Sequence, residues 1–150
     1  MTDNRNVVHA TFVLERTYPV SRARVFDAFS DADRKRDWFT GLSGADHSLD
    51  FRVGGRETSH GKMPNGGDMH YDAVYFDIVP GQRIVYAYEM RFGDQRISAT
   101  LTTVELDETD GGTRLKFTEQ GAYLDGFDGP AYWERGTTSL LERLGQSFEE

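Results

Sequence analysis

The fold is decided by residues 69–92, which read MHYDAVYFDIVPGQRIVYAYEMRF. Both halves of this stretch are rich in β-branched and aromatic residues, which are typical of β-strands. Pro80-Gly81 lies between the halves, and this pair favours a type II turn. The stretch therefore predicts two long antiparallel strands joined by a tight turn.

Segments of the same kind continue the strand pattern on both sides of this hairpin. They are HATFVLERTY (9–18), LDFRV (49–53), RETSHGK (56–62), QRISATLTTVELDE (95–108) and TRLKFTEQG (113–121). Turn sequences separate the later segments: Gly54-Gly55, MPNGGD (63–68), Gly93-Asp94 and TDGG (109–112). Gly54-Gly55 suits the positive φ angles of a two-residue hairpin. We therefore expect an antiparallel sheet of about six to seven strands.

Helices are predicted in two regions outside these strands. Ser21 is a candidate N-cap for one short helix, and Asp31 for a second short helix that precedes Trp38-Phe39. After Asp128-Gly129-Pro130, apolar residues recur at helical spacing over residues 133–148. This spacing predicts a long amphipathic helix.

These elements together predict an α+β fold in which the long helix packs across a curved antiparallel sheet, because neither can bury its apolar surface alone. A chain of 150 residues, 37% of them hydrophobic, is enough for one domain. We place this domain at residues 1–150, with its core at about 9–148. A curved sheet that grips a long helix leaves a hollow between them, where a ligand would bind.

Composition excludes several classes of function. The chain has no cysteine, which removes disulfides, thiol nucleophiles and iron–sulfur clusters. Its net charge of -8 would repel phosphate backbones, so nucleic acid is not an expected partner. No apolar run approaches the roughly 20 residues of a membrane span, and the first residues lack a secretory pattern. We therefore expect a soluble, cytoplasmic protein that does not bind membranes.

Several segments, in order along the chain, resemble one known family. They are residues 20–38, FRVGG (51–55), DIVP (77–80), RIVY (83–86) and GGTRL (111–115). Over roughly residues 9–148, the chain is similar to the activator of Hsp90 ATPase homologue 1-like family of the START/Bet v 1-like (SRPBCC) superfamily. The resemblance implies a helix-grip fold with a cavity between the C-terminal helix and the sheet. It implies no single reaction, because such relatives include lipid and hydrophobic-ligand binders, polyketide cyclases and co-chaperone domains.

The strand over residues 82–92 offers the clearest cavity wall. Tyr86, Tyr88 and Met90 share one face of it, and phenols beside a thioether form an amphipathic surface. Ordinary core packing is the alternative for each of them, and the tyrosines are the better candidates for lining a cavity. The predicted ligand-binding residues are Trp38, Phe39, Phe51, Tyr71, Tyr86, Tyr88, Met90, Phe117, Trp133, Thr137 and Leu140.

Glu119 is the main candidate for acid–base chemistry. Alternation along the segment 113–121 places it on the inward face with Leu115 and Phe117. A carboxyl among apolar groups has a raised pKa and can act as a general acid or base near neutrality. Two structural alternatives are that Glu119 lies at the solvent-exposed end of its strand or forms an ion pair with Arg16.

His60 and His70 are further catalytic candidates. They flank the MPNGGD turn and would approach each other if their strands pair, so they could carry protons. Two imidazoles beside a carboxylate could bind a divalent metal, but no compact ligand motif supports this and no metal is expected. The paired glycines lack the lysine and the strand-to-helix context of a phosphate loop, so no cofactor is expected.

Two features of the predicted helices are open to interpretation. Gly136 lies inside the long helix, where glycine costs about 1 kcal/mol relative to alanine. Either the sheet approaches closely there, or the missing side chain widens the ligand space beside Trp133 and Thr137. The cations Arg22, Arg24, Arg34, Lys35 and Arg36 are interleaved with aspartates and are interpreted as a solvated helical face.

The sequence favours binding of a small hydrophobic or amphipathic ligand in this cavity. One alternative is a cofactor-independent enzyme of the cyclase, dehydratase or hydrolase kind, with Glu119 or a histidine as acid or base. A further alternative is a co-chaperone-like or stress-response interaction module. Exposed edge strands would also allow a homodimer.

Overall fold

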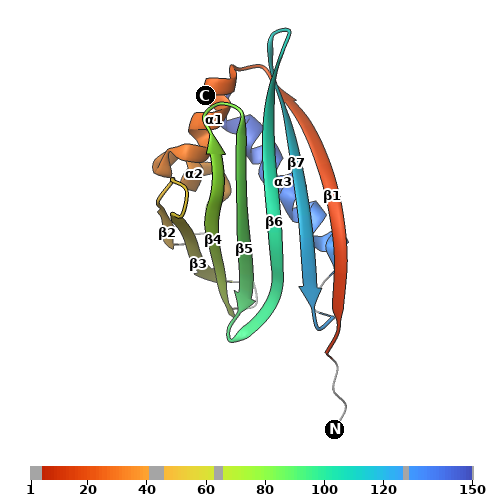
Figure 1. The fold of residues 1–150 in the computed structure, drawn as a ribbon. Helices are drawn as coiled ribbons and strands as arrows, with labels where there is room; N and C mark the ends of the chain where they lie inside the picture. The colour runs from red at the N-terminus through yellow and green to blue at the C-terminus, as the bar shows by residue number, and fades with distance from the viewer. Residues whose placement is uncertain (1–4, 41–45, 63–65, 127–128, 150) are drawn as a thin grey trace.

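A seven-stranded antiparallel sheet forms the body of the protein (Figure 1). The computed structural model describes residues 5–40, 46–62, 66–126 and 129–149. The sheet order is β1-β7-β6-β5-β4-β3-β2, so β1 and β2 form its edges. The strands are β1 (Val7–Tyr18), β2 (Asp46–Leu49), β3 (Arg56–Lys62), β4 (Asp68–Val79), β5 (Arg83–Phe92), β6 (Gln95–Thr109) and β7 (Gly112–Leu124).

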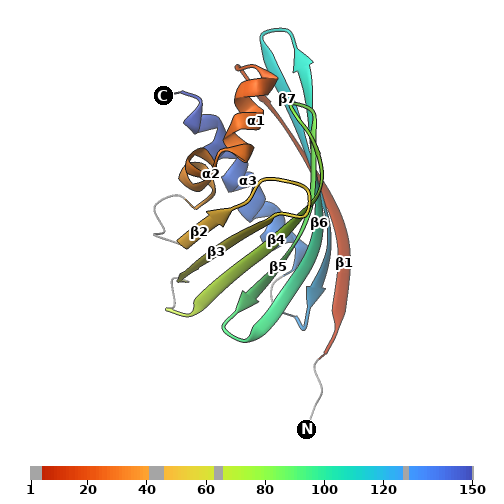
Figure 2. The ribbon, with the colours of Figure 1, turned by 60° about the vertical axis from the view of Figure 1, so that its left-hand side comes forward.

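The helices of the described residues all lie on one face of this sheet. They are α1 (Arg22–Ser30), α2 (Ala32–Phe39) and α3 (Pro130–Ser147). The sheet curves around α3, and α1 and α2 lie beside the C-terminal half of α3 (Figure 2). This arrangement confirms the predicted α+β helix-grip fold. In the described part of the chain, no helix is long and apolar enough to span a membrane.

Both predicted helix caps are present. The Ser21 hydroxyl accepts a hydrogen bond from the Arg24 amide at 3.2 Å, and the Asp31 carboxylate accepts from the amides of Asp33 and Arg34. The second helix runs further than predicted, to Phe39, which places Trp38 and Phe39 in its last turn. Of the predicted start signal of α3, Gly129 is the N-cap and Pro130 the first helical residue, while Asp128 lies outside the described residues.

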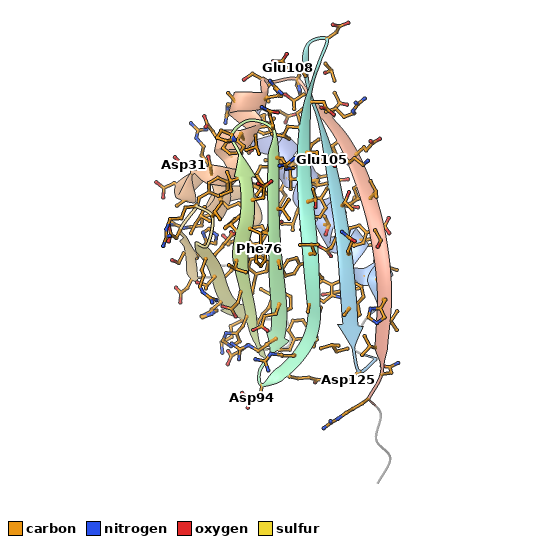
Figure 3. All side chains as sticks on the ribbon, viewed as in Figure 1. Asp31, Phe76, Asp94, Glu105, Glu108 and Asp125 are labelled. Atoms are coloured by element: carbon orange, nitrogen blue, oxygen red, sulfur yellow. The ribbon has the colours of Figure 1, made fainter. Side chains whose placement is uncertain are left out.

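The central hairpin is regular except at one point. The register of β4 against β5 passes from Tyr75 opposite Tyr86 to Asp77 opposite Val85, which leaves Phe76 as the extra residue of a β-bulge. Phe76 is 57% exposed and lies on the outer face of the sheet, away from the helices (Figure 3). On either side of the bulge, alternate residues of β4 and β5 point toward α3.

The strand predicted over residues 49–53 is wrong. β2 ends at Leu49, which pairs with Glu57 of β3, so the connection is longer than a two-residue hairpin. Within it the Arg52 amide donates to the Asp50 carbonyl, and the Gly55 amide donates to the Arg52 carbonyl. The chain therefore turns before Phe51 can join a strand. The first part of the predicted turn at MPNGGD, residues 63–65, lies outside the described residues.

Helix α3 is docked tightly at its C-terminal end and loosely in its N-terminal half. The Tyr18 hydroxyl donates a hydrogen bond to the Leu141 carbonyl at 2.8 Å. A Cβ at Gly145 would lie 3.1 Å from the Tyr18 ring, whereas a Cβ at Gly136 would meet no atom within 4 Å. The first interpretation of Gly136, a close approach of the sheet, is therefore wrong.

A buried ion pair fastens α2 to the sheet. Lys35 Nζ lies 2.9 Å from Glu57 Oε1 of β3, and their side chains are 1% and 0% exposed. The Tyr75 hydroxyl donates to Glu57 Oε1 at 2.7 Å, and His47 Nε2 lies 2.7 Å from Glu57 Oε2. Burial would raise the pKa of Glu57, but the Lys35 charge and these hydrogen bonds outweigh it and lower the pKa to about 2. Glu57 is therefore a fixed negative charge.

This ion pair corrects the interpretation of Lys35 as part of a solvated face. Arg34 and Arg36 are exposed, as expected, but Lys35 lies on the same side of α2 as Trp38 and Phe39. Its ammonium lies 4.6 Å from the centre of the Phe39 ring. Lys35 thus places a buried cation against the Phe39 ring.

Replacing Lys35 with methionine should leave the Glu57 carboxylate buried without its cation. We expect the free energy of unfolding to fall by about 3–5 kcal/mol, measured by urea denaturation. The double variant Lys35→Met/Glu57→Gln should lose less than the sum of its single variants, because both charges are removed. Arg34→Met, on the exposed side of α2, is the matched control and should stay within about 0.5 kcal/mol of the wild type. Equal stability of Lys35→Met and Arg34→Met would contradict this account.

Candidate ligand-binding site

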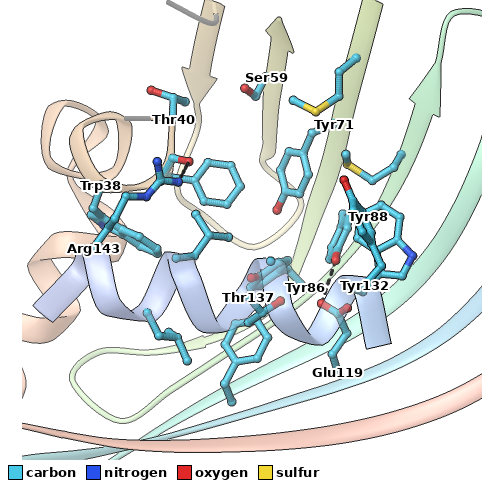
Figure 4. A pocket seen from close by; sticks show the side chains of 18 of the residues that line it. Trp38, Thr40, Ser59, Tyr71, Tyr86, Tyr88, Glu119, Tyr132, Thr137 and Arg143 are labelled. Carbon is cyan, nitrogen blue, oxygen red and sulfur yellow. Dashed lines mark hydrogen bonds between the residues drawn. The ribbon is translucent and has the colours of Figure 1, made fainter. Parts of the chain in front are cut away.

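A cavity of about 360 Å³ lies between α3 and the concave face of the sheet (Figure 4). Most of the predicted ligand-binding residues line it: Trp38, Phe39, Tyr71, Tyr86, Tyr88, Met90, Phe117, Trp133, Thr137 and Leu140. Sequence reasoning missed other lining residues: Thr40, Ser59, Met69, Phe92, Tyr132, Leu141 and Arg143. The volume falls within the range of small-molecule sites, about 300–1,000 Å³. Contact of these residues with a ligand remains a prediction.

The walls of the cavity are mainly aromatic. Tyr71 and Tyr88 have ring centroids 4.8 Å apart, and Phe39 packs edge-on against Tyr71 at 5.1 Å. Tyr86 lies next to Tyr88 on β5, as the alternation of that strand predicted. Gly136 lies among the lining residues with no neighbour where a Cβ would stand. Gly136 is exposed, so the missing side chain leaves space at the solvent-facing rim of the cavity on the α3 side.

Phe51 does not line this cavity, which corrects its predicted role. Its ring packs edge-on against Phe26 of α1 at 5.6 Å and against Tyr75 of β4 at 5.0 Å between centroids. The cause is the long connection after β2, which carries Phe51 out of the strand. Phe51 is thus a partly buried residue that packs against the core between α1 and β4.

Glu119 points inward, as alternation along β7 predicted. It is 1% exposed and lines the cavity, and its Oε1 accepts hydrogen bonds from the hydroxyls of Tyr88 at 2.8 Å and Thr102 at 3.4 Å. Neither structural alternative is realised, because Arg16 lies opposite Leu115 and donates to the Glu15 carbonyl. Burial raises the pKa of Glu119 to about 7 and outweighs the hydrogen bonds, which lower it. This carboxyl therefore changes its protonation near neutral pH.

Tyr123 completes the surroundings of this carboxyl. Its ring folds back over Gly121, where a Cβ would lie 2.7 Å from the Tyr123 hydroxyl. Only glycine leaves room for the ring at that position. The ring stacks on Trp133 with centroids 6.1 Å apart, and burial and the nearby Glu119 raise the pKa of Tyr123. The end of the cavity at Glu119 is therefore surrounded by hydroxyl groups.

Trp133 Nε1 is a buried polar atom of the lining that has no hydrogen-bond partner among the described residues. Tyr71 Oη and Glu119 Oε2 are also buried, and each has a hydroxyl as a neighbour: that of Tyr86 beside Tyr71 and that of Tyr123 beside Glu119. Buried polar atoms in folded proteins are generally hydrogen-bonded, so each such atom is a candidate contact for a bound molecule. At the other end of the cavity, Arg143 Nη2 donates to the Phe39 carbonyl at 3.3 Å.

His60 and His70 come together, as expected, but not in the cavity. They are opposite each other in β3 and β4, with ring centroids 4.5 Å apart. Ser59 and Tyr71, the next residue on each strand, line the cavity, so the two histidines lie on the outer face of the sheet. The pair is therefore not placed to act on a molecule bound in the cavity, and its catalytic role stays a prediction. Within the described ranges, no group of three or more histidine and carboxylate side chains is placed to hold a metal ion.

Comparison with known proteins places this geometry in context. A family model described as activator of Hsp90 ATPase homolog 1-like protein matches residues 19–149. A protein of Rhizobium leguminosarum is 44% identical, with 97% of each chain covered and a TM-score of 0.93. Mll3558 of Rhizobium loti is 50% identical, covering 95% of this chain and 99% of that chain, with a TM-score of 0.90. CalU16 of Micromonospora echinospora shares the fold at 16% identity, covering 95% of this chain and 83% of that chain, with a TM-score of 0.69. Among curated proteins, none matches the chain.

The raised pKa of Glu119 should make stability depend on pH. Between about 4.5 and about 7, the native carboxyl holds a proton that the unfolded chain releases. Stability from this group is therefore fully present below 4.5 and is lost as pH rises through 7. At about 1.4 kcal/mol per pKa unit, the free energy of unfolding should fall by about 2–3 kcal/mol between pH 5 and pH 8 relative to Glu119→Gln. Glu142→Gln, which changes an exposed carboxyl of α3, is the control, and its free energy of unfolding should depend on pH as that of the wild type does. The prediction fails if the free energy of unfolding of Glu119→Gln, measured by urea denaturation, shows the same pH dependence as the wild type.

Proposed function

The chain belongs to the activator of Hsp90 ATPase homolog 1-like family, and from this premise we propose that it binds a small hydrophobic or amphipathic molecule in the cavity beneath α3. The observation that carries the proposal is the open volume between α3 and the sheet, lined mostly by aromatic rings. Gly136 of α3, which has no side chain, is one of the residues around that volume. These features support the binding of a small ligand in the cavity.

The driving force would be removal of apolar ligand surface from water. At about 25 cal/mol per Å², burying roughly 200 Å² of apolar surface contributes about 5 kcal/mol. Met69 and Met90 would let the wall adapt to the outline of the ligand, because thioether side chains are flexible and polarisable. The hydroxyls of Tyr71 and Tyr88 and the Glu119 carboxyl would select its orientation.

A second candidate function is acid–base catalysis on the bound molecule. The Glu119 carboxyl favours it, because its pKa of about 7 allows it to give or take a proton near neutral pH. Glu119 lines the cavity, and its Oε2, which has the Tyr123 hydroxyl as a neighbour, can accept a further hydrogen bond. The carboxyl is thus available to a substrate group, while Tyr88 holds the other oxygen in place.

Filling the cavity from the α3 side should abolish binding without unfolding the protein. We expect Gly136→Phe to lose small molecules that co-purify with the wild type, as detected by native mass spectrometry. It should also lose the ligand-induced thermal shift, which reflects about 2.7 kcal/mol at one hundred times the dissociation constant. Gly136→Ala is the matched control and should bind as the wild type does, with stability raised by up to about 1 kcal/mol. Wild-type binding by a folded Gly136→Phe protein would refute the proposed site.

The proposed catalytic function is tested with the co-purifying molecule that native mass spectrometry identifies. Glu119→Gln should bind it as tightly as the wild type and convert it about 100-fold or more slowly, as expected for loss of a general acid or base. Product formation would be followed by mass spectrometry over time. An equal rate in the two proteins would remove Glu119 from any reaction and leave binding as the function.

A further inference from the structure

The cavity is chemically different at its two ends. It follows α3 from Trp133 to Arg143, a distance of about 15 Å at roughly 1.5 Å per residue. Glu119, Tyr88 and Tyr132 lie together at one end, and Arg143 lies beside Thr40 at the other (Figure 4). A ligand that fills the cavity would therefore meet different groups at each of its ends.

The Glu119 end matches a hydroxyl group. Trp133 Nε1 can only donate a hydrogen bond, and an ionised carboxylate can only accept one. Trp133 Nε1 is buried and has no partner within the described residues, while Glu119 Oε2 is buried and has the Tyr123 hydroxyl as a neighbour. Both groups lie beside Tyr123, which stacks on Trp133 and interacts with Glu119. A carboxylate oxygen can accept a second hydrogen bond, so a ligand hydroxyl, which both accepts and donates, matches the indole and the carboxylate. When Glu119 is ionised, it would repel a second carboxylate at this end.

The Arg143 end matches a carboxylate. Arg143 donates to the Phe39 carbonyl, and a guanidinium has five N–H donors, so most of them remain available for a ligand. Across the part of the chain that the structure describes, no carboxylate lies within ion-pair distance of Arg143, and no other cation lines the cavity. The planar guanidinium fits a carboxylate with two parallel hydrogen bonds. The neighbouring Thr40 hydroxyl donates to the Arg36 carbonyl instead.

We propose that the ligand is an elongated molecule with a carboxylate at one end, held by Arg143, and a hydroxyl group at the other, held by Glu119 and Trp133. Its apolar middle would lie against Tyr86, Tyr88 and Phe117. This inference rests on the proposed binding function and names the chemical class of its ligand. The orientation is fixed, because the reverse placement brings the carboxylate against Glu119 and leaves Arg143 without an anion.

Three probes with the same ten-carbon chain separate the two ends. They are ω-hydroxydecanoic acid, decanoic acid, which lacks the hydroxyl, and decane-α,ω-diol, which lacks the carboxylate. We expect the wild type to bind ω-hydroxydecanoic acid about tenfold more tightly than either other probe by isothermal titration calorimetry, since each end adds one hydrogen-bonded contact.

Two conservative variants should each remove one preference. Arg143→Gln should bind the hydroxy acid and the diol equally, because it lacks the cation. Trp133→Phe should lose much of the preference for the hydroxy acid over decanoic acid, because it keeps an aromatic ring but lacks the N–H donor. Arg135→Gln removes the same charge from an exposed position of α3 and should bind all three probes as the wild type does.

The outcomes separate this inference from the function on which it rests. Equal wild-type affinity for the hydroxy acid and the diol, or equal effects of Arg143→Gln and Arg135→Gln, would overturn the ligand class while binding itself stands. Binding of no probe would also overturn the ligand class. In that case, a co-purifying molecule that Gly136→Phe loses would preserve the proposed function, and retention of that molecule by Gly136→Phe would refute both.

Discussion

The ion pair between Lys35 and Glu57 is the contact on which the cavity depends. A carboxylate with 0% exposure is tolerated only when a cation and hydrogen-bond donors surround it. Glu57 on β3 meets this requirement with groups from three other elements: Lys35 of α2, His47 of β2 and Tyr75 of β4. Moving α2 would leave two charges buried without partners. The last turn of α2 therefore stays in place, and with it Phe39, which forms one wall of the cavity.

The two buried glutamates, Glu57 and Glu119, have opposite pKa shifts because their surroundings differ. Glu57 faces an ammonium and has a pKa lowered to about 2, whereas Glu119 faces only hydroxyls and has a pKa raised to about 7. Burial acts in the same direction on both, so the presence of Lys35 decides the difference. Glu57 keeps its charge and holds the fold together. Glu119 lines the cavity among hydroxyl groups and has no cation beside it among the described residues, which makes it the carboxyl suited to a ligand.

The sequence predicted the fold well, because alternation and helix caps are local signals. Alternation also oriented Glu119 correctly, and it placed Tyr86, Tyr88, Met90 and Phe117 on the cavity side of the sheet. The failures concern contacts between distant segments. The sequence does not show that Lys35 meets a carboxylate twenty-two residues away, although its spacing from Trp38 and Phe39 marked it as facing inward. The position of Phe51 depends on the length of the connection between β2 and β3, and the pair Gly54-Gly55 did not indicate that length.

The existence of the cavity follows from how α3 is docked. Glycine weakens a helix by a similar amount wherever it lies in the interior, so the sequence does not distinguish Gly136 from Gly145. At Gly145 the helix approaches the Tyr18 ring so closely that a Cβ would lie only 3.1 Å from it, and the Tyr18 hydroxyl donates to the Leu141 carbonyl. At Gly136, more than two turns earlier, nothing fills the space that a side chain would take. Near its N-terminus α3 meets the sheet again, where Trp133 stacks on Tyr123 of β7, and the curvature of the sheet leaves space between these two contacts. The hollow is therefore a consequence of the geometry that stabilises the fold, and the residues that line it are free to serve a ligand.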